Sequence, residues 1–278
     1  MKSPVVSVGG KFRLVDKILP LIPSHEIYVE VFGGAGWLLF KKPPSKVEIY
    51  NDIDSNLVNL FRVIRDPQKF EKFYEQVRLT LYSREEFEYY KNLEPRDDIE
   101  KAVRTFILIR QSFNAKKGHW GYGTAKNCAH PKSYFAAVEE IPLIHRRLRN
   151  VYIENNDFRK VIRRYDSENT FFYCDPPYIL ETRRCVMYRD FEMSLDDHKD
   201  LVQLLLDIKG TAILSCYYHP IYDPLIEAGW IRKDFEVLCN AVGKAGKIKG
   251  KGALQNHKRV ETLLIKPKKD YNLFSNLG

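Results

Sequence analysis

The stretch EIYVEVFGGAGWLLF, residues 26–40, reads as a strand, a glycine turn and the start of a helix. A second strand is predicted at KVEIYNDID, residues 46–54, where an apolar run stops at acids. The helical pattern SNLVNLFRVI follows, and we expect Ser55 to be its N-cap. Strand, glycine turn, helix and strand make up half of a doubly wound parallel sheet, so the sequence predicts an α/β fold.

Further strands are predicted at four places, with one helix between two of them. The strands are NVYIENND, TFFYCD, TAILSCY and ETLLIKP, at residues 150–157, 170–175, 211–217 and 261–267. The helix is SLDDHKDLVQLLLDIKG, with Ser194 as its cap and Gly210 as its stop. We expect its apolar side to carry Leu195, His198, Leu201, Leu204 and Leu205.

A helical insertion is predicted between the glycine turn and the strand at 170–175, because the chain between them is about twice as long as a compact α/β sheet needs. The insertion contains REEFEYYKNL, DDIEKAVRTFILIRQSF and SYFAAVEEIPLIHRRLRN, interrupted by NAKKGHWGYGTAKNCAHPK. Residues 1–66 and 151–278 are therefore expected to form one α/β domain. Residues 67–150 are expected to form an inserted, mainly helical subdomain.

The stretch FFYCDPPYIL, residues 171–180, stops a buried strand abruptly. Pro176 and Pro177 lack amide hydrogens, so the strand must end at Asp175. The two prolines also hold Asp175 and the carbonyls beside it rigidly at the sheet edge. Taken alone, the stretch is most simply a strand and a proline turn, but rigid acceptors at a strand's carboxyl end also indicate a binding site.

The glycine turn EVFGGAG, residues 30–36, lets the main chain come close to a ligand. It is not G-x-G-x-x-G, so a pyrophosphate cofactor is not favoured, whereas a nucleoside without phosphates suits it. About 20 residues later, Asp52 and Asp54 offer a carboxylate for ribose hydroxyls. A structural turn with a helix-capping acid is the alternative interpretation.

The net charge of +9 favours a polyanionic partner. The loop GKAGKIKGKG, residues 243–252, carries Lys247 and Lys249 and can follow a phosphate backbone, unless it is only a solvated loop. Two interpretations are open for Phe113 and Trp120: they belong to a packed core, or they contact DNA together with their neighbours. The candidate DNA-binding residues of the insertion mix cations, an amide and aromatic rings, which suits phosphates, base edges and the gap left by a flipped base: Arg110, Asn114, Lys116, Lys117, Trp120 and Tyr122.

Several classes of protein are not supported by the composition. Five scattered cysteines without C-x-x-C spacing argue against a disulfide framework and a zinc site, and we expect no metal. There is no apolar run of about 18 residues. The start MKSPVVSVGGKF lacks the apolar part of a signal peptide, so we expect a cytoplasmic protein with no membrane contact.

The glycine turn, the ribose-type acid and DPPY together resemble the amino methyltransferases that use S-adenosylmethionine, and the order of motifs is similar to the DNA adenine methylases of the Dam type. The resemblance extends over nearly the whole chain. The other matching stretches are VGGKF at 8–12, FILIRQSFNAKKGHWGYG at 106–123, NNDF at 155–158 and KRVETLLIKP at 258–267. The resemblance implies a Rossmann-like methyltransferase sheet with an inserted DNA-recognition subdomain, and site-specific transfer of a methyl group to N6 of adenine in double-stranded DNA.

The resemblance also implies a role for individual residues. Lys11, Glu30, Phe32 and Gly34 would line the pocket of S-adenosylmethionine near its methionine part. Asp52 would take the ribose hydroxyls, while Asp157 and Phe158 would hold the cofactor's adenine. Asp175, which is also counted among the cofactor-binding residues, would accept a hydrogen bond from the target amine together with the Pro176 carbonyl, and Tyr178 would stack on the flipped base.

Other functions stay open from the sequence. The alternatives are an amino methyltransferase acting on cytosine N4 or on RNA, and a DNA-binding module without catalysis. Cys174 is expected to be a strand residue and not a nucleophile. We expect a monomer, and a cognate restriction endonuclease is considered as a functional but not a physical partner.

Overall fold

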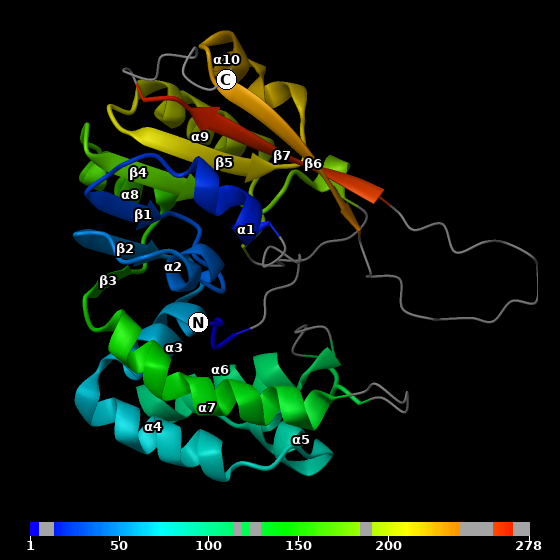
Figure 1. The fold of residues 1–278 in the computed structure, drawn as a ribbon. Helices are drawn as coiled ribbons and strands as arrows, with labels where there is room; N and C mark the ends of the chain where they lie inside the picture. The colour runs from blue at the N-terminus through cyan, green and yellow to red at the C-terminus, as the bar shows by residue number, and fades with distance from the viewer. Residues whose placement is uncertain (6–13, 114–117, 123–128, 184–190, 239–257, 269–278) are drawn as a thin grey trace, which may run out of the picture.

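The computed structural model describes residues 1–5, 14–113, 118–122, 129–183, 191–238 and 258–268 (Figure 1). Within this part of the chain, seven strands form one sheet in the order β3-β2-β1-β4-β5-β7-β6. The first five strands in that order are parallel, and β7 is antiparallel to both of its neighbours. The strands are β1 (Ile27–Glu30), β2 (Val47–Asn51), β3 (Val151–Glu154), β4 (Thr170–Cys174), β5 (Thr211–Cys216), β6 (Ile231–Leu238) and β7 (Lys258–Lys266). The predicted α/β class and the parallel core of the sheet are confirmed.

Both faces of the sheet are covered by helices, which explains why its central strands are apolar throughout. On β4, Phe171 and Tyr173 face one core and Phe172 and Cys174 face the other. The first core is shared with α1 (Val15–Ile18), α2 (Trp37–Lys41) and α3 (Ser55–Arg65). The second core is shared with α8 (Phe158–Tyr165), α9 (Leu195–Asp207) and α10 (Asp223–Glu227). Three short 3-10 turns, η2 (Leu19–Leu21), η4 (Leu180–Thr182) and η6 (Pro220–Tyr222), complete the connections among the described residues.

The insertion is helical, as predicted, and lies below the sheet in Figure 1. It contains α4 (Pro67–Leu79), α5 (Arg84–Asn92), α6 (Asp98–Gln111) and α7 (His130–Leu148). Its buried side chains, among them Phe73, Phe106 and Tyr134, belong to the same apolar cluster as α3 and one face of the sheet. Because α3 packs against α4, α6 and α7, it joins the insertion to the sheet. The boundaries at residues 66 and 151 stay a prediction.

Several local predictions need correction. The N-cap of α3 is Asp54 and not Ser55, because the Asp54 carboxylate accepts the amide hydrogen of Asn56 at 2.9 Å. The buried side of α9 includes His198, Leu201 and Leu205 as predicted, but Leu195 is 42% exposed. Strand β6 and helix α8 were not predicted.

Helix α9 begins as predicted but ends for a different reason. Ser194 caps it within a capping box formed with Asp197. The helix ends at Asp207, before Gly210. A Cβ atom on Gly210 would lie 2.4 Å from the Thr170 carbonyl oxygen, so this glycine permits close packing against the start of β4 and does not stop the helix.

The predictions about the cysteines and about membrane-spanning segments can be compared with the described residues. Cys174 and Cys216 are buried on β4 and β5, as expected of strand thiols, while Cys128, Cys185 and Cys239 lie outside the described residues. None of the helices in the described part of the chain combines the length and the apolar character that crossing a bilayer would require.

Candidate active site

The carboxyl ends of β1, β2 and β4 bring three acids to one rim of the sheet. Glu30 is the last residue of β1 and lies opposite Tyr50 of β2 and Tyr173 of β4. Asp52 and Asp175 each follow the end of their own strand within two residues of that level. The charge of Asp175 is among the influences that raise the pKa of Glu30, as expected for neighbouring carboxyl groups. The glycine turn and the DPPY turn therefore share this rim.

The glycine turn is shaped by close packing at Gly33 and by backbone conformation at Gly34. A Cβ atom on Gly33 would lie 2.2 Å from the ring of Tyr50, and the Tyr50 hydroxyl donates to the Gly34 carbonyl at 2.7 Å. Gly34 has a φ of 50°, a left-handed value that favours glycine, and a Cβ atom built there would meet no atom within 4 Å. The turn thus leaves open space beside its main chain.

Asp52 is tied to the glycine turn. Its carboxylate accepts the Gly34 amide at 2.6 Å and the Asp54 amide at 2.7 Å. Burial raises the pKa of Asp52 to about 6, although both amide hydrogen bonds act in the opposite direction. The position at the end of β2 is the usual place for a carboxylate that accepts ribose hydroxyls.

Glu30 is almost fully buried at the end of β1. Its Oε2 atom accepts the Tyr28 hydroxyl at 2.8 Å and the Leu39 amide at 2.9 Å. Burial raises the pKa of Glu30 to about 8, and both hydrogen bonds limit the rise. Burial thus favours the neutral form of this acid, while the charge of Lys42 acts in the opposite direction.

An aromatic pair extends the site toward β3. The rings of Phe32 and Phe158 lie 5.5 Å apart, Phe32 half-buried and Phe158 buried. Asp157 caps α8 by accepting the Arg159 amide at 2.8 Å, and it pairs with the Arg159 guanidinium at 3.0 Å. Both Asp157 and Phe158 stand at the carboxyl end of β3, and their contact with a cofactor stays a prediction.

Asn51 was missed by the sequence reasoning, although it connects the loops that form the site. Its side-chain amide donates to the Val31 carbonyl at 2.9 Å and to the Asn156 carbonyl at 3.0 Å. Its Oδ1 atom accepts the Asn156 amide at 2.9 Å. The available signal was an amide at the end of an apolar strand, where a buried polar group needs partners.

The DPPY turn presents a half-buried Asp175 and a half-buried Tyr178 on either side of two prolines. The Tyr178 hydroxyl donates to Glu261 of β7 at 2.6 Å, and the main-chain carbonyl of Tyr178 accepts from the Arg183 side chain at 2.6 Å. Glu261 and Arg183 were not predicted to belong to the site, although Glu261 lies inside the stretch KRVETLLIKP.

The predicted DNA-binding residues that are described lie around the end of α6. A short antiparallel bridge joins Ser112 to Trp120, and the rings of Trp120 and Tyr122 stack with centroids 5.9 Å apart. The guanidinium of Arg84, which was not predicted, lies over both rings at 5.0 and 5.5 Å. Tyr122 is 61% exposed.

Arg110 is placed differently from its neighbours. It is half-buried and donates to the carbonyl of Ser133 on α7. Burial lowers the pKa of Arg110 to about 10. Part of its hydrogen-bonding capacity is thus used inside the protein. The other predicted contacts lie outside the described residues: Lys11, Asn114, Lys116, Lys117, Lys247 and Lys249.

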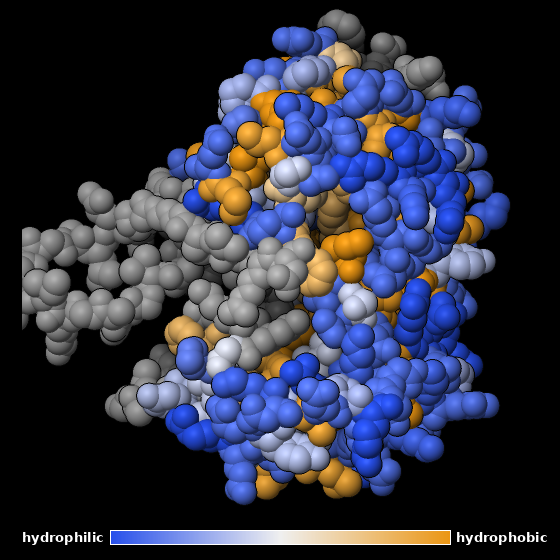
Figure 2. Space-filling view, turned by 180° about the vertical axis from the view of Figure 1, so that it is seen from behind, coloured by the Kyte–Doolittle hydropathy of each residue, from blue (hydrophilic) through white to orange (hydrophobic). Residues whose placement is uncertain are grey.

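Hydrophilic side chains cover much of the face seen from behind, and apolar side chains show between them in the upper part and near mid-height (Figure 2).

Comparison with known proteins adds independent findings. The family described as D12 class N6 adenine-specific DNA methyltransferase matches residues 7–219. The type II methyltransferase M1.LlaDCHI of Lactococcus lactis subsp. cremoris is 31% identical over 255 residues, which cover 82% of this chain and 84% of that protein. The DNA adenine methylases of Serratia marcescens and Salmonella typhi are 26% and 25% identical, over 70% and 74% of this chain and 74% and 76% of their own lengths. The family match includes the glycine turn, Asp52 and the DPPY turn.

Proposed function

The chain belongs to the D12 class of N6 adenine-specific DNA methyltransferases, and from this premise we propose how its residues carry out the reaction. The resemblance to DNA adenine methylases is confirmed, and the chain is an enzyme that methylates adenine in DNA. The cytosine, RNA and non-catalytic alternatives have no comparable support.

S-adenosylmethionine, the general methyl donor of such enzymes, supplies an electrophilic methyl group on a sulfonium when it is bound. The residues of the rim fit it in three respects. Gly34 faces open space, Asp52 presents a carboxylate at the ribose position, and Phe32 provides a half-buried aromatic wall. We assign Glu30 and Lys11 to the methionine part, and Asp157 and Phe158 to the adenine ring.

The Glu30 proton is relevant to this assignment. Burial raises the pKa of Glu30 to about 8. A cation that binds beside this carboxyl group lowers its pKa again and so favours the ionised form, which attracts the cation. The amino and sulfonium groups of the donor are cations, so Glu30 can lose its proton as they bind. This supports a place for Glu30 beside the charged end of the cofactor.

Asp175 and the Pro176 carbonyl act on the target amine. The N6 amine of adenine is a poor nucleophile because its lone pair is delocalised into the ring. Two acceptors that bind its hydrogens draw the nitrogen toward tetrahedral geometry and direct the lone pair at the methyl group. The Asp175 carboxylate then stabilises the positive charge that develops on nitrogen. The proline pair supports this role because it fixes the acceptors before substrate binds.

Tyr178 and the aromatic group on α6 act on the DNA. The target base must leave the duplex to be reached, and Tyr178 offers a ring for it to stack on. The stacked Trp120 and Tyr122, with Arg84 over them, offer aromatic surface and a cation for bases and phosphates. Cytoplasmic location, a monomeric state and an accompanying restriction endonuclease also belong to this proposal.

Base-resolution sequencing tests the reaction. The chain is expressed in a host that lacks adenine methylation, and methylated positions are mapped in its DNA. We expect N6-methyladenine at one short sequence. Methyl groups found on cytosine, or none at all while the protein binds DNA, would overturn the proposal.

Two variants test the division of work between the acids. Asp175→Ala is expected to abolish turnover with little change in cofactor affinity, because this carboxylate addresses the target amine. Asp52→Ala is expected to weaken cofactor affinity first. Calorimetric titration with S-adenosylhomocysteine and a labelled-methyl assay measure both effects. Equal loss of cofactor affinity in the two variants would contradict the assignment.

A further inference from the structure

Tyr178 is held at both ends by residues to which the mechanism above gives no role. Its hydroxyl donates to Oε2 of Glu261 at 2.6 Å and lies 3.2 Å from the Ser215 hydroxyl. Its carbonyl accepts from Nε of Arg183, whose guanidinium also pairs with Glu192. The ring of Tyr217 meets the Tyr178 ring edge-on, with centroids 4.6 Å apart. The ring is therefore fixed at its tip, at one side and at its own main chain.

The sheet topology brings Glu261 to this place from a distant part of the sequence. Strand β7 runs antiparallel to β5, and Thr262 lies opposite Cys216, the last residue of β5. Glu261 is one residue further, at the carboxyl rim of β5 and beside the turn that follows β4. Glu261 is buried, with 4% of its surface exposed. It contacts Tyr178 although the two residues are 83 positions apart in the sequence.

The hydrogen bond to the buried Glu261 carboxylate favours a single orientation of the Tyr178 ring. Hydrogen bonds from a hydroxyl to a carboxylate are shorter and stronger than neutral ones. A buried carboxylate that loses its donor also bears a desolvation cost, so the Tyr178 hydroxyl and Glu261 hold each other. The orientation matters because a displacement of about 1 Å in a reacting group can cost about 100-fold in rate.

We propose that Glu261 is a positioning residue for the methyl transfer, and that it acts through the Tyr178 hydroxyl to set the plane on which the target adenine stacks. The inference rests on the proposed function, because it takes the role of Tyr178 from there. Glu261 meets the phenol and not the reacting atoms. Its effect must therefore disappear when the phenol hydroxyl is removed.

A double-mutant cycle tests this dependence on a duplex that contains the mapped target. Tyr178→Phe and Glu261→Leu are each expected to lower the single-turnover rate of methyl transfer by about 10-fold. The double variant is expected to be no slower than either single variant, because both remove the same interaction. Glu261→Gln keeps a carbonyl acceptor and is expected to recover most of the rate. Glu227→Gln, an exposed acid on α10, serves as the control and should leave the rate unchanged.

A second measurement does not depend on turnover. When 2-aminopurine replaces the target adenine, its fluorescence is quenched by stacking on an aromatic ring. We expect the protein complexes of Tyr178→Phe and Glu261→Leu to be brighter than the wild-type complex to the same extent. Affinities for DNA and for S-adenosylhomocysteine should stay within about twofold of wild type, because both variants keep an aromatic ring at position 178 and neither residue is assigned to phosphates or to the cofactor.

The outcomes separate this inference from the proposed function. If the wild type transfers no methyl group, the proposed function fails and the inference fails with it. If the wild type is active and the losses of the two variants multiply in the double variant, only the inference is overturned. An unchanged rate in Tyr178→Phe, which keeps the ring and needs no rearrangement of the core, would also overturn it even if Glu261→Leu does not fold.

Discussion

At the scale of single residues, Gly33 has no room for a side chain. The ring that an added Cβ would meet belongs to Tyr50, which is 1% exposed and packs edge-on against Phe61 at 4.6 Å. This ring is part of the core and also binds the Gly34 carbonyl, so it cannot move aside without displacing the turn.

We therefore predict that Gly33→Ala lowers the free energy of unfolding by about 1–3 kcal/mol, the usual cost of overpacking. It should also lower the affinity for S-adenosylhomocysteine, because the Gly34 amide, which donates to Asp52, moves with the turn. Urea denaturation and calorimetry measure the two effects. A variant with unchanged stability and unchanged affinity would show that Tyr50 has room to move.

The pKa of Asp52 predicts a pH dependence. Burial raises this pKa from 3.8 to about 6, so the folded protein binds this proton more tightly than the unfolded chain does. The stability contributed by this proton is fully present below pH 3.8 and is lost as the pH rises through about 6. Ribose hydroxyls, in contrast, donate best to the ionised carboxylate.

The affinity for S-adenosylhomocysteine should accordingly fall as the pH drops through about 6. Binding by calorimetry between about pH 5 and 8 measures this, and Asp52→Asn should lose the change near pH 6 and keep only the pH dependence that the Glu30 proton contributes, at lower affinity. The assignment of Asp52 to the ribose would be wrong if the wild type and Asp52→Asn had parallel profiles.

At the scale of elements, α9 offers a test of local capping. The Ser194 hydroxyl accepts the Asp197 amide at 3.1 Å, and the Asp197 carboxylate accepts the Ser194 amide at 2.9 Å. Ser194→Ala removes half of this capping box and should cost about 1 kcal/mol, which corresponds to a fall in melting temperature of about 2–4 °C. Ser24→Ala, at an exposed serine, should not change the melting temperature. Equal melting temperatures for both variants would mean that the cap is dispensable.

The elements also show which parts of the fold could be predicted. Strands that are buried on both faces can be recognised in the sequence as apolar runs, as in TFFYC and TAILSC. Strand β6, with the sequence IRKDFEVL, has no such run, because it lies at the sheet edge and owes its conformation to pairing with β7. Its recognition requires the partner strand, which the local sequence does not reveal.

The same distinction applies to the candidate site. Asp52 and Asp175 could be found because each acid ends a strand in its own sequence neighbourhood. Asn51 and Glu261 could not, because their partners lie 105 and 83 residues away and meet them only through the order of the strands. Asp54 and Ser55 are adjacent residues of the type that caps helices, so the local sequence could not decide between them.

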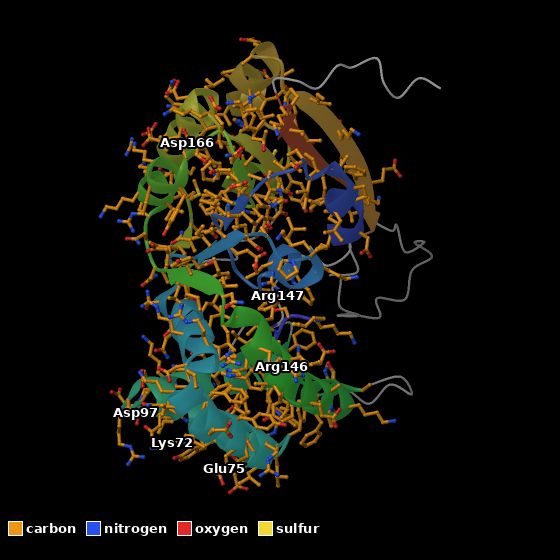
Figure 3. All side chains as sticks on the ribbon, turned by 60° about the vertical axis from the view of Figure 1, so that its left-hand side comes forward. Lys72, Glu75, Asp97, Arg146, Arg147 and Asp166 are labelled. Atoms are coloured by element: carbon orange, nitrogen blue, oxygen red, sulfur yellow. The ribbon has the colours of Figure 1, made fainter. Side chains whose placement is uncertain are left out.

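At the scale of the whole molecule, a buried ionic group joins the helical insertion to the sheet. Arg147, in the last turn of α7, is labelled in Figure 3 next to Arg146. It forms two hydrogen bonds to the Glu48 carboxylate of β2 and one to the Leu39 carbonyl of α2 at 2.9 Å. Lys42 donates to the same carboxylate at 2.6 Å. Burial acts to raise the pKa of Glu48, but the bonds from Arg147 and Lys42 outweigh it, and the pKa lies below its ordinary value.

This group also reaches the candidate cofactor site. Leu39 uses its carbonyl for Arg147 and its amide for Glu30, the buried acid at the end of β1. Helix α7 is thus connected, through one residue of α2, to a side chain assigned to the cofactor. A change at Arg147 should therefore be detected both in stability and in the glycine turn.

We predict that Arg147→Ala lowers the free energy of unfolding by about 3 kcal/mol, because it leaves Glu48 with one cation where it had two in a buried setting. Arg146→Ala is the matched control, since Arg146 is the preceding residue of α7 and is exposed. Urea denaturation measures stability, and S-adenosylhomocysteine affinity reports on the glycine turn. Equal stabilities of Arg147→Ala and Arg146→Ala would show that the insertion is held to the sheet by its apolar contacts alone.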